Sequence, residues 1–181
     1  VHYLGEQIID YVNKKKFNLS IKIIREKDKI LDTGGGVSNA IKNFSNEPLL
    51  ILNPDTIWNS DYLKEFRMME ELFFKNEKNK CTLLVVNKTK SFDKFFGGDF
   101  DLQNKLINRK DKNKLNYIYT GLQIISPKVF SSSKAEVFSI NRIWDYLMQN
   151  NELFGIESNI NFFHVSTLDI YKNLSKKNFK R

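Results

Sequence analysis

Residues 31–58 constrain this chain more than any other stretch, because a glycine triplet, a helix, an apolar strand and an aspartate follow one another there. The stretch reads LDTGGGVSNAIKNFSNEPLLILNPDTIW. Consecutive glycines permit positive φ angles and let a ligand lie against the main chain without meeting a Cβ atom. Apolar residues at helical spacing follow over residues 37–44. We therefore predict a glycine turn that leads into a helix N-terminus, where free N–H groups favour anions and carbonyl-rich ligands.

The apolar run PLLIL at residues 48–52 predicts a strand that is covered on both faces of a parallel sheet. Asp55 follows at its carboxyl end, which is the edge where open α/β sheets bind ligands. The stretch contains neither a G-x-x-x-x-G-K-[ST] phosphate loop nor a G-x-G-x-x-G fingerprint, so we set aside both kinds of site. The alternative is structural: the glycines form an ordinary loop, and residues 53–55 form a turn.

Composition indicates a globular protein with one domain over residues 1–181, since 41% of the residues are hydrophobic and 13% aromatic. The single cysteine, Cys81, opens the apolar run CTLLVV and cannot form an internal disulfide. We predict a reduced core residue and a cytoplasmic location. No apolar run approaches the roughly 20 residues of a membrane span, and no signal-peptide pattern is present, so no membrane partner is expected.

The formal net charge of +8 has local contributions from residues 14–16 and from a basic tail of Lys176, Lys177, Lys180 and Arg181. Such runs usually form solvated surface. The other interpretation is attraction of polyanions, either nucleic acid or a nucleotide and a phosphorylated substrate. A nucleic-acid interface would gather lysines and aromatic residues on one face, whereas the aromatic residues here mostly occupy apolar positions. We expect no nucleic-acid partner.

Hydrophobic periodicity predicts alternating strands and helices, an order typical of a mostly parallel, doubly wound α/β sheet. Gly121 interrupts an otherwise strong strand, which indicates a bulge or a close approach of a ligand. The predicted helices cover residues 4–17, 37–44, 61–75, 140–150 and 167–176, and the predicted strands cover residues 1–3, 21–24, 48–52, 81–87, 117–126 and 162–165, with a hairpin or edge strand within residues 95–107.

Five segments in this order, LDTGGGVSNAI, LLILNPDTIW, GGDFDL, YTGLQIISPKVF and HVSTLDIY, carry a resemblance to a known family. The chain resembles the sugar-1-phosphate nucleotidyltransferases, especially the bacterial N-acetylmuramate α-1-phosphate uridylyltransferases. The resemblance implies a Rossmann-like α/β/α fold with a mostly parallel central sheet. It also implies transfer of a nucleotidyl group, UMP from UTP, to hexose 1-phosphate or N-acetylmuramate 1-phosphate, with release of pyrophosphate.

The resemblance implies that Asp55 is catalytic and a ligand of Mg²⁺. The family's second metal ligand is usually an aspartate in W-x-D-x-G-T; here His164 stands at that position and Ser166 replaces the glycine. Imidazole suits Mn²⁺ better than Mg²⁺. Either His164 coordinates the metal, or it binds a phosphate while Asp55 and water hold the metal. The implied nucleotide contacts are Thr33, Gly34, Gly35, Gly36 and Asn53, and the implied sugar-phosphate contacts are Gly98, Asp99, Thr120 and Gly121.

The family also has a first strand and a glycine-rich loop that contains an arginine, and neither is found in this sequence. Val1 begins in the middle of a pattern, so we expect an N-terminal truncation that is inactive as it stands. A G-x-x-x-R segment encoded upstream would test this. The competing hypothesis is a non-catalytic, nucleotide-sugar-binding regulatory protein on the same fold, motivated by His164 and Ser166. The sequence leaves the sugar and the oligomeric state open.

Overall fold

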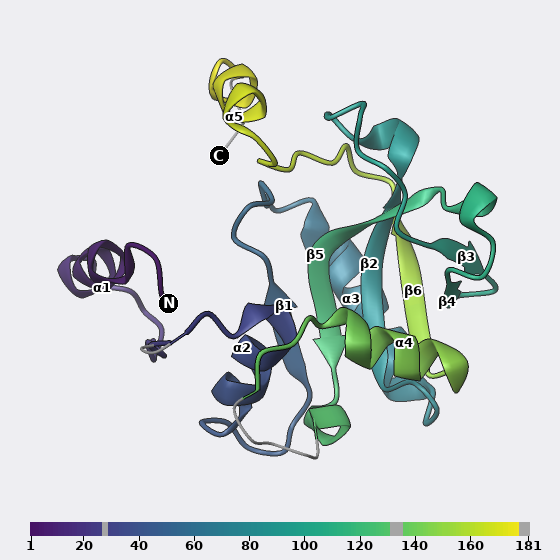
Figure 1. The fold of residues 1–181 in the computed structure, drawn as a ribbon, viewed down its shortest axis with the longest axis horizontal. Coiled ribbons are helices and arrows are strands. Elements are labelled where there is room, and N and C mark those ends of the chain that lie inside the picture. The colour runs from purple at the N-terminus through teal and green to yellow at the C-terminus, as the bar shows by residue number, and fades with distance from the viewer. Residues whose placement is uncertain (27–28, 131–135, 178–181) are drawn as a thin grey trace. The chain divides into compact units, whose positions relative to one another are not determined.

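The computed structural model describes residues 1–26, 29–130 and 136–177, in two compact units. We call Val1–Asn46 with Phe130–Ile143 unit 1, and Glu47–Val129 with Trp144–Arg181 unit 2. The sheet in Figure 1 belongs entirely to unit 2. Its strands, in the order β1-β5-β2-β6-β4-β3, are β1 (Leu49–Leu52), β5 (Tyr117–Ile125), β2 (Cys81–Asn87), β6 (Leu153–Ser158), β4 (Leu106–Asn108) and β3 (Asp101–Gln103).

The sheet is mixed. β2 pairs with β6 in parallel, whereas β5 lies antiparallel between β1 and β2. The predicted α/β fold is confirmed, and β1, β2 and β6 run in one direction, as a parallel order requires. The mostly parallel pairing that was predicted is not found, because the long apolar strand β5 lies between β1 and β2 and is antiparallel to both. A central position satisfies the backbone of β5 along both of its edges.

The strand β1 is an edge strand. Leu50 is 45% exposed and Leu52 is 48% exposed, so the predicted burial on both faces is wrong. The apolar run alone could not reveal this, because an edge strand and a central strand can share the same composition. The position of β1 is set instead by the antiparallel register of Leu49 to Leu52 against β5.

Helix α3 (Tyr62–Lys75) covers one face of the sheet in unit 2 (Figure 1). Met69 and Phe73 pack in one cluster with Leu84 and Ile124. The predicted helix is confirmed, and Leu63 on its outer side is 62% exposed.

The other face of the sheet carries Trp144 of helix α4 (Asn141–Gln149). Its indole N–H donates to the Gln123 side-chain oxygen at 3.0 Å, and its ring meets that of Tyr119 edge-on at 4.8 Å between centroids. The Cys81 thiol donates to the same Gln123 oxygen at 3.4 Å. Cys81 is buried and free, as predicted.

The end of the chain contains one strand that the sequence analysis missed, β6. Gly155 interrupts its apolar alternation, and a Cβ there would lie 2.5 Å from Ile107 Cδ1, so close packing explains the glycine. Residues 162–165 form isolated bridges instead of the predicted strand. Helix α5 (Leu168–Ser175) is confirmed, with Thr167 as its N-cap. Lys180 and Arg181 lie outside the described residues.

Unit 1 contains helix α1 (Gly5–Lys14) and helix α2 (Asp32–Ile41). Residues 1–3 and 21–24 are not strands, contrary to the prediction. Helix α1 forms where its apolar spacing predicts, although none of its residues is buried. None of the helices in the described part of the chain has the length and apolarity that a membrane crossing requires.

Candidate functional site

The loop that leaves β1 is fixed to the central strand β5 on both sides of Asp55. The Asn53 N–H donates to the carbonyl oxygen of Gly121 at 2.8 Å. The Thr56 hydroxyl donates to the carbonyl oxygen of Thr120 at 2.7 Å, and this bond is buried. Asp55 is therefore held at the carboxyl end of β1, the edge that the sequence predicts for ligand binding.

Asp55 and His164 lie together, as the motif positions suggested. The His164 Nε2 atom is 3.1 Å from Asp55 Oδ2, and the Val165 N–H donates to the Asp55 carbonyl oxygen at 2.8 Å. The His164 ring stacks on Phe162 at 5.7 Å, and Phe96 meets it edge-on at 5.4 Å. Side chain and main chain thus join two segments that lie far apart in the sequence.

The pair of Asp55 and His164 fits a divalent cation that keeps most of its own water. The Asp55 side chain is 46% exposed and offers a hard oxygen ligand, which suits Mg²⁺. The imidazole beside it suits Mn²⁺ better. The described residues contain no group of three or more His, Cys, Asp and Glu side chains that could enclose an ion. An ion at this pair would need water and substrate phosphate oxygens to complete its shell.

Asp99 lies beside β5, and its N–H donates to the Tyr117 carbonyl oxygen at 2.8 Å. Its Oδ2 atom accepts the Tyr119 N–H at 3.0 Å. Burial raises the pKa of the Asp99 carboxyl group, while the Tyr119 N–H and the charges of Arg109 and His164 oppose that rise. The carboxylate is therefore oriented by the backbone of the strand and lies within electrostatic range of His164.

Glycine is required at two predicted sugar-phosphate positions. A Cβ at Gly98 would lie 2.0 Å from the Leu115 carbonyl oxygen. Gly121 has φ of +93° in β5, and the pairing of β5 with β2 shifts register beside it, which confirms the predicted bulge. Thr120 is 1% exposed and its hydroxyl donates to the Leu84 carbonyl oxygen at 2.9 Å, so this side chain supports the strand.

The glycine triplet lies inside the first turns of helix α2, not in a turn before it. Gly34, Gly35 and Gly36 are helical and do not have positive φ, so the predicted glycine turn is wrong. The N–H groups of Gly34 and Gly35 both donate to the Phe138 carbonyl oxygen at 3.0 Å. A Cβ at Gly35 would lie 2.2 Å from the Glu136 carbonyl oxygen. Because these glycines have no side chains, residues 136–138 of the same unit can pack directly against their backbone.

The structure brings part of the predicted site together. The Thr33 hydroxyl accepts the Ile140 N–H at 3.0 Å within unit 1. The predicted nucleotide contacts Thr33, Gly34, Gly35 and Gly36 all lie in unit 1, and their role stays a prediction. Around the end of β1 and along β5, unit 2 places the predicted residues Asn53, Asp55, Gly98, Asp99, Thr120, Gly121 and His164.

Sequence reasoning missed the side chains that hold these residues. Phe96 and Phe162 flank the His164 ring, and the Ser166 hydroxyl donates to Asp93 Oδ2 at 2.9 Å. The repeated phenylalanines in KFFGG and NFFHV could have signalled the aromatic contact. No sequence signal links Asp93 to Ser166, because the two residues meet only through the fold.

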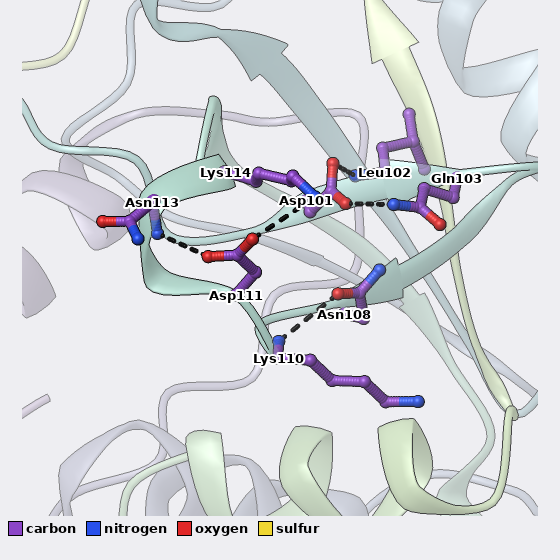
Figure 2. Close-up of polar contacts among 8 residues, drawn as sticks. All are labelled: Asp101, Leu102, Gln103, Asn108, Lys110, Asp111, Asn113 and Lys114. Atoms are coloured by element: carbon purple, nitrogen blue, oxygen red, sulfur yellow. Dashed lines mark hydrogen bonds and ion pairs between the residues drawn. The ribbon is translucent and has the colours of Figure 1, made fainter.

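A second polar region, at the hairpin of β3 and β4, has a different character (Figure 2). It borders a cavity of about 300 Å³. Asp101 accepts the Gln103 side-chain N–H at 2.7 Å, and Asp111 accepts the Asn113 N–H at 3.0 Å and lies 3.3 Å from the Lys114 ammonium group. These carboxylates pair locally with backbone and side-chain donors, so they shape the hairpin and its following turn.

Comparison with known proteins yields relatives of one enzyme class. No family model matches the chain. It is 22% identical over 170 residues to the N-acetylmuramate α-1-phosphate uridylyltransferase of Caulobacter vibrioides, covering 91% of this chain and 70% of the relative. It is 25% identical over 181 residues to the D-glycero-α-D-manno-heptose 1-phosphate guanylyltransferase of Aneurinibacillus thermoaerophilus, covering 97% of this chain and 74% of the relative.

Solved structures share the fold. The crystal structure of HddC from Yersinia pseudotuberculosis, complexed with GMP-PN, matches with a TM-score of 0.69 and 20% identity, covering 96% of this chain and 74% of that chain. The inositol-1-phosphate CTP transferase from T. maritima matches with a TM-score of 0.62 and 17% identity, covering 96% of this chain and 71% of that chain.

Proposed function

We infer that the protein containing this chain, a member of the sugar-1-phosphate nucleotidyltransferase family, transfers the nucleotidyl group of UTP to a sugar 1-phosphate and releases pyrophosphate. The observation that carries the proposal is the pair of Asp55 and His164 at the carboxyl end of β1, with Asp99 nearby on the same edge of β5. Carboxylate and imidazole at this edge suit a metal–phosphate ligand.

Catalysis of this reaction requires the protein mainly to position the substrates and to neutralise the charge on their phosphates. A sugar phosphate oxygen attacks the α-phosphorus of the triphosphate in line, and pyrophosphate leaves. Mg²⁺, when bound, would supply positive charge that offsets the negative charge of the phosphates. In our proposal Asp55 holds the ion, with His164 as a further ligand or as a donor to a phosphate. Asn53 and Thr56 fix the loop on either side, so Asp55 needs little reorganisation.

Asp99 and the bulge at Gly121 are proposed to border the sugar phosphate. A carboxylate oriented by the Tyr119 N–H can accept a hydrogen bond from a sugar hydroxyl. We place UTP first because the Caulobacter vibrioides relative is a uridylyltransferase. GTP is the competing donor, since the Aneurinibacillus thermoaerophilus relative is a guanylyltransferase. Hexose 1-phosphate and N-acetylmuramate 1-phosphate are the proposed acceptors, and Thr33 to Gly36 and Asn53 the proposed nucleotide contacts.

The test is pyrophosphate release by the protein containing this chain, with each nucleoside triphosphate paired with each sugar 1-phosphate. We expect Asp55→Ala to lower kcat by roughly 10² to 10³-fold, the usual effect of removing one electrostatic stabiliser of the transition state. Asp10→Ala removes an exposed carboxylate from helix α1 and is the control. Native turnover in Asp55→Ala would exclude the assigned site, and preference for GTP would correct the donor alone.

The second candidate is a non-catalytic, nucleotide-sugar-binding regulatory protein on the same fold. His164 and Ser166 at the predicted metal segment favour it, since an imidazole is a weaker ligand for Mg²⁺ than a carboxylate. Equilibrium binding of a nucleotide sugar without pyrophosphate release from any triphosphate would support this candidate over the enzyme.

A further inference from the structure

Glu65 is a buried carboxylate whose position demands an explanation. It lies in the first turn of α3 and is only 8% exposed, and its Oε1 atom accepts the Asn159 N–H at 3.0 Å. Its Oε2 atom has no hydrogen-bond partner within the described residues. Burying a carboxyl group that leaves one oxygen without a partner is costly to the fold.

The partner of Glu65 opens the segment that carries His164. We call residues 159–165 the His164 segment; it runs from the end of β6 and forms no strand of its own. Neighbouring loops bind its backbone along its length. The Phe162 N–H donates to the Lys90 carbonyl oxygen at 3.0 Å, and the Val165 N–H donates to the Asp55 carbonyl oxygen at 2.8 Å.

The Lys90 carbonyl group ends a single 3-10 turn (Lys88–Lys90) and the Asp55 carbonyl group lies in a loop, so both backbone contacts are to short stretches outside the sheet and the α-helices. Glu65 is different, because it belongs to a helix whose Met69 and Phe73 lie in the main core. Its bond to Asn159 fixes the start of the segment to that helix. The same turn contains a second bond, from the Ile160 N–H to the Ser158 hydroxyl at 3.1 Å.

We propose that Glu65 is a positioning residue. It holds the His164 segment in register with the loop that leaves β1 and carries Asp55. Glu65 thereby sets the contact between His164 Nε2 and Asp55 Oδ2. Without this acceptor the Asn159 N–H turns toward water, and the turn that begins the segment moves. The proposal rests on the proposed function of Asp55 and His164 as a metal–phosphate site.

The experiment compares Glu65→Met, which keeps an apolar side chain of similar length, with Glu65→Gln, which keeps an acceptor for the Asn159 N–H. Asn79→Met is the matched control. Asn79 is also buried beside α3, at the opposite end of that helix, and bonds to Thr82 at 2.7 Å. Because the chain has only two histidines, the ring resonances of His164 can be assigned with His164→Gln and followed by NMR.

We expect Glu65→Met to shift the His164 ring resonances and to raise the Mn²⁺ concentration at half-saturation by about 10-fold, the lower end of what loss of an outer-shell partner costs a metal site. Glu65→Gln should restore both values. Asn79→Met should lower the unfolding midpoint while His164 and the Mn²⁺ titration stay native. Should Glu65→Met fail to fold, Ser158→Ala is expected to shift the same resonances in the same direction, to a smaller extent.

Native His164 resonances in Glu65→Met, together with a lowered unfolding midpoint, would make Glu65 a stability residue and overturn the proposal. The same holds for Ser158→Ala if that variant replaces it. A native protein that binds no Mn²⁺ contradicts the proposed function instead. The resonance comparison needs neither metal nor turnover and still decides the role of Glu65.

Discussion

At the scale of single residues, one backbone angle in β5 determines how the loop that leaves β1 packs against that strand. Gly121 has φ of +93°, and a Cβ there would lie 2.7 Å from the Asn53 Cβ atom. We expect Gly121→Ala to lower the free energy of unfolding by about 2 kcal/mol, because both the φ angle and the contact become strained. Urea unfolding measures this.

Gly97→Ala is the control for Gly121→Ala. A Cβ at Gly97 would meet no atom within 4 Å, and Gly97 does not have positive φ. We expect a change within about 0.5 kcal/mol, as for an exposed position without special contacts. Equal losses in the two variants would show that the bulge is not the cause.

The site residues show what a sequence can and cannot supply at this scale. Asp55 and Gly121 could be found from their places in the strand pattern, since a carboxylate at a strand end and a glycine inside a strand each have a physical meaning. The glycine triplet was misread because its composition is equally compatible with a ligand cradle and with close packing of the protein's own chain. Only the carbonyl oxygens of Glu136 and Phe138 distinguish these cases.

At the scale of elements, the exposure of β1 has a measurable consequence. Leu50 is 45% exposed on this edge strand, whereas Leu84 of β2 is 0% exposed in the main core. We expect Leu84→Ala to lower the free energy of unfolding by about 2 to 5 kcal/mol, since it leaves a cavity. Leu50→Ala should lower the free energy of unfolding by less than about 1 kcal/mol, because folding removes little of the Leu50 side chain from water. Chemical denaturation of both variants tests the order; equal losses would contradict the edge position of β1.

Elements with a strong local pattern were predictable. Residues 81–87 and 117–126 are almost continuously apolar and became β2 and β5, and the spacing over residues 61–75 became α3. Strand order was not predictable, because the insertion of β5 between β1 and β2 depends on pairing between distant segments. β6 escaped detection because Gly155 breaks its pattern, and residues 21–24 resemble a strand although unit 1 offers them no partner strand within its described residues.

At the scale of the whole molecule, buried tyrosines make stability depend on alkaline pH. Burial, with the charges of Glu65 and Asp61, raises the pKa of Tyr62 to about 12. Burial also raises the pKa of Tyr119 well above its usual value. In the unfolded chain these tyrosines ionise near pH 10, while in the folded chain they keep their protons. Their contribution to stability is therefore constant below about pH 10 and is lost as pH rises toward 12.

Urea midpoints between pH 8 and pH 11.5 measure this dependence. We expect Tyr62→Phe to flatten the decline, because phenylalanine has no proton to lose in either state. Tyr171→Phe, at a position that is 55% exposed in helix α5, is the control and should leave the slope unchanged. A slope that Tyr62→Phe does not alter would contradict the assigned cause.

The insertion of β5 between β1 and β2 also has a consequence for biosynthesis. β1 and β2 emerge from the ribosome first, yet the sheet gives them no hydrogen bonds to each other; both pair with β5, which is made later. His164, near the end of the chain, joins Asp55 later still. A nascent chain therefore carries two apolar strands without their native partner until Tyr117–Ile125 has been translated. During that interval the growing polypeptide is exposed to aggregation and to chaperone binding, and the contact of Asp55 with His164 forms only after residue 164 has been translated.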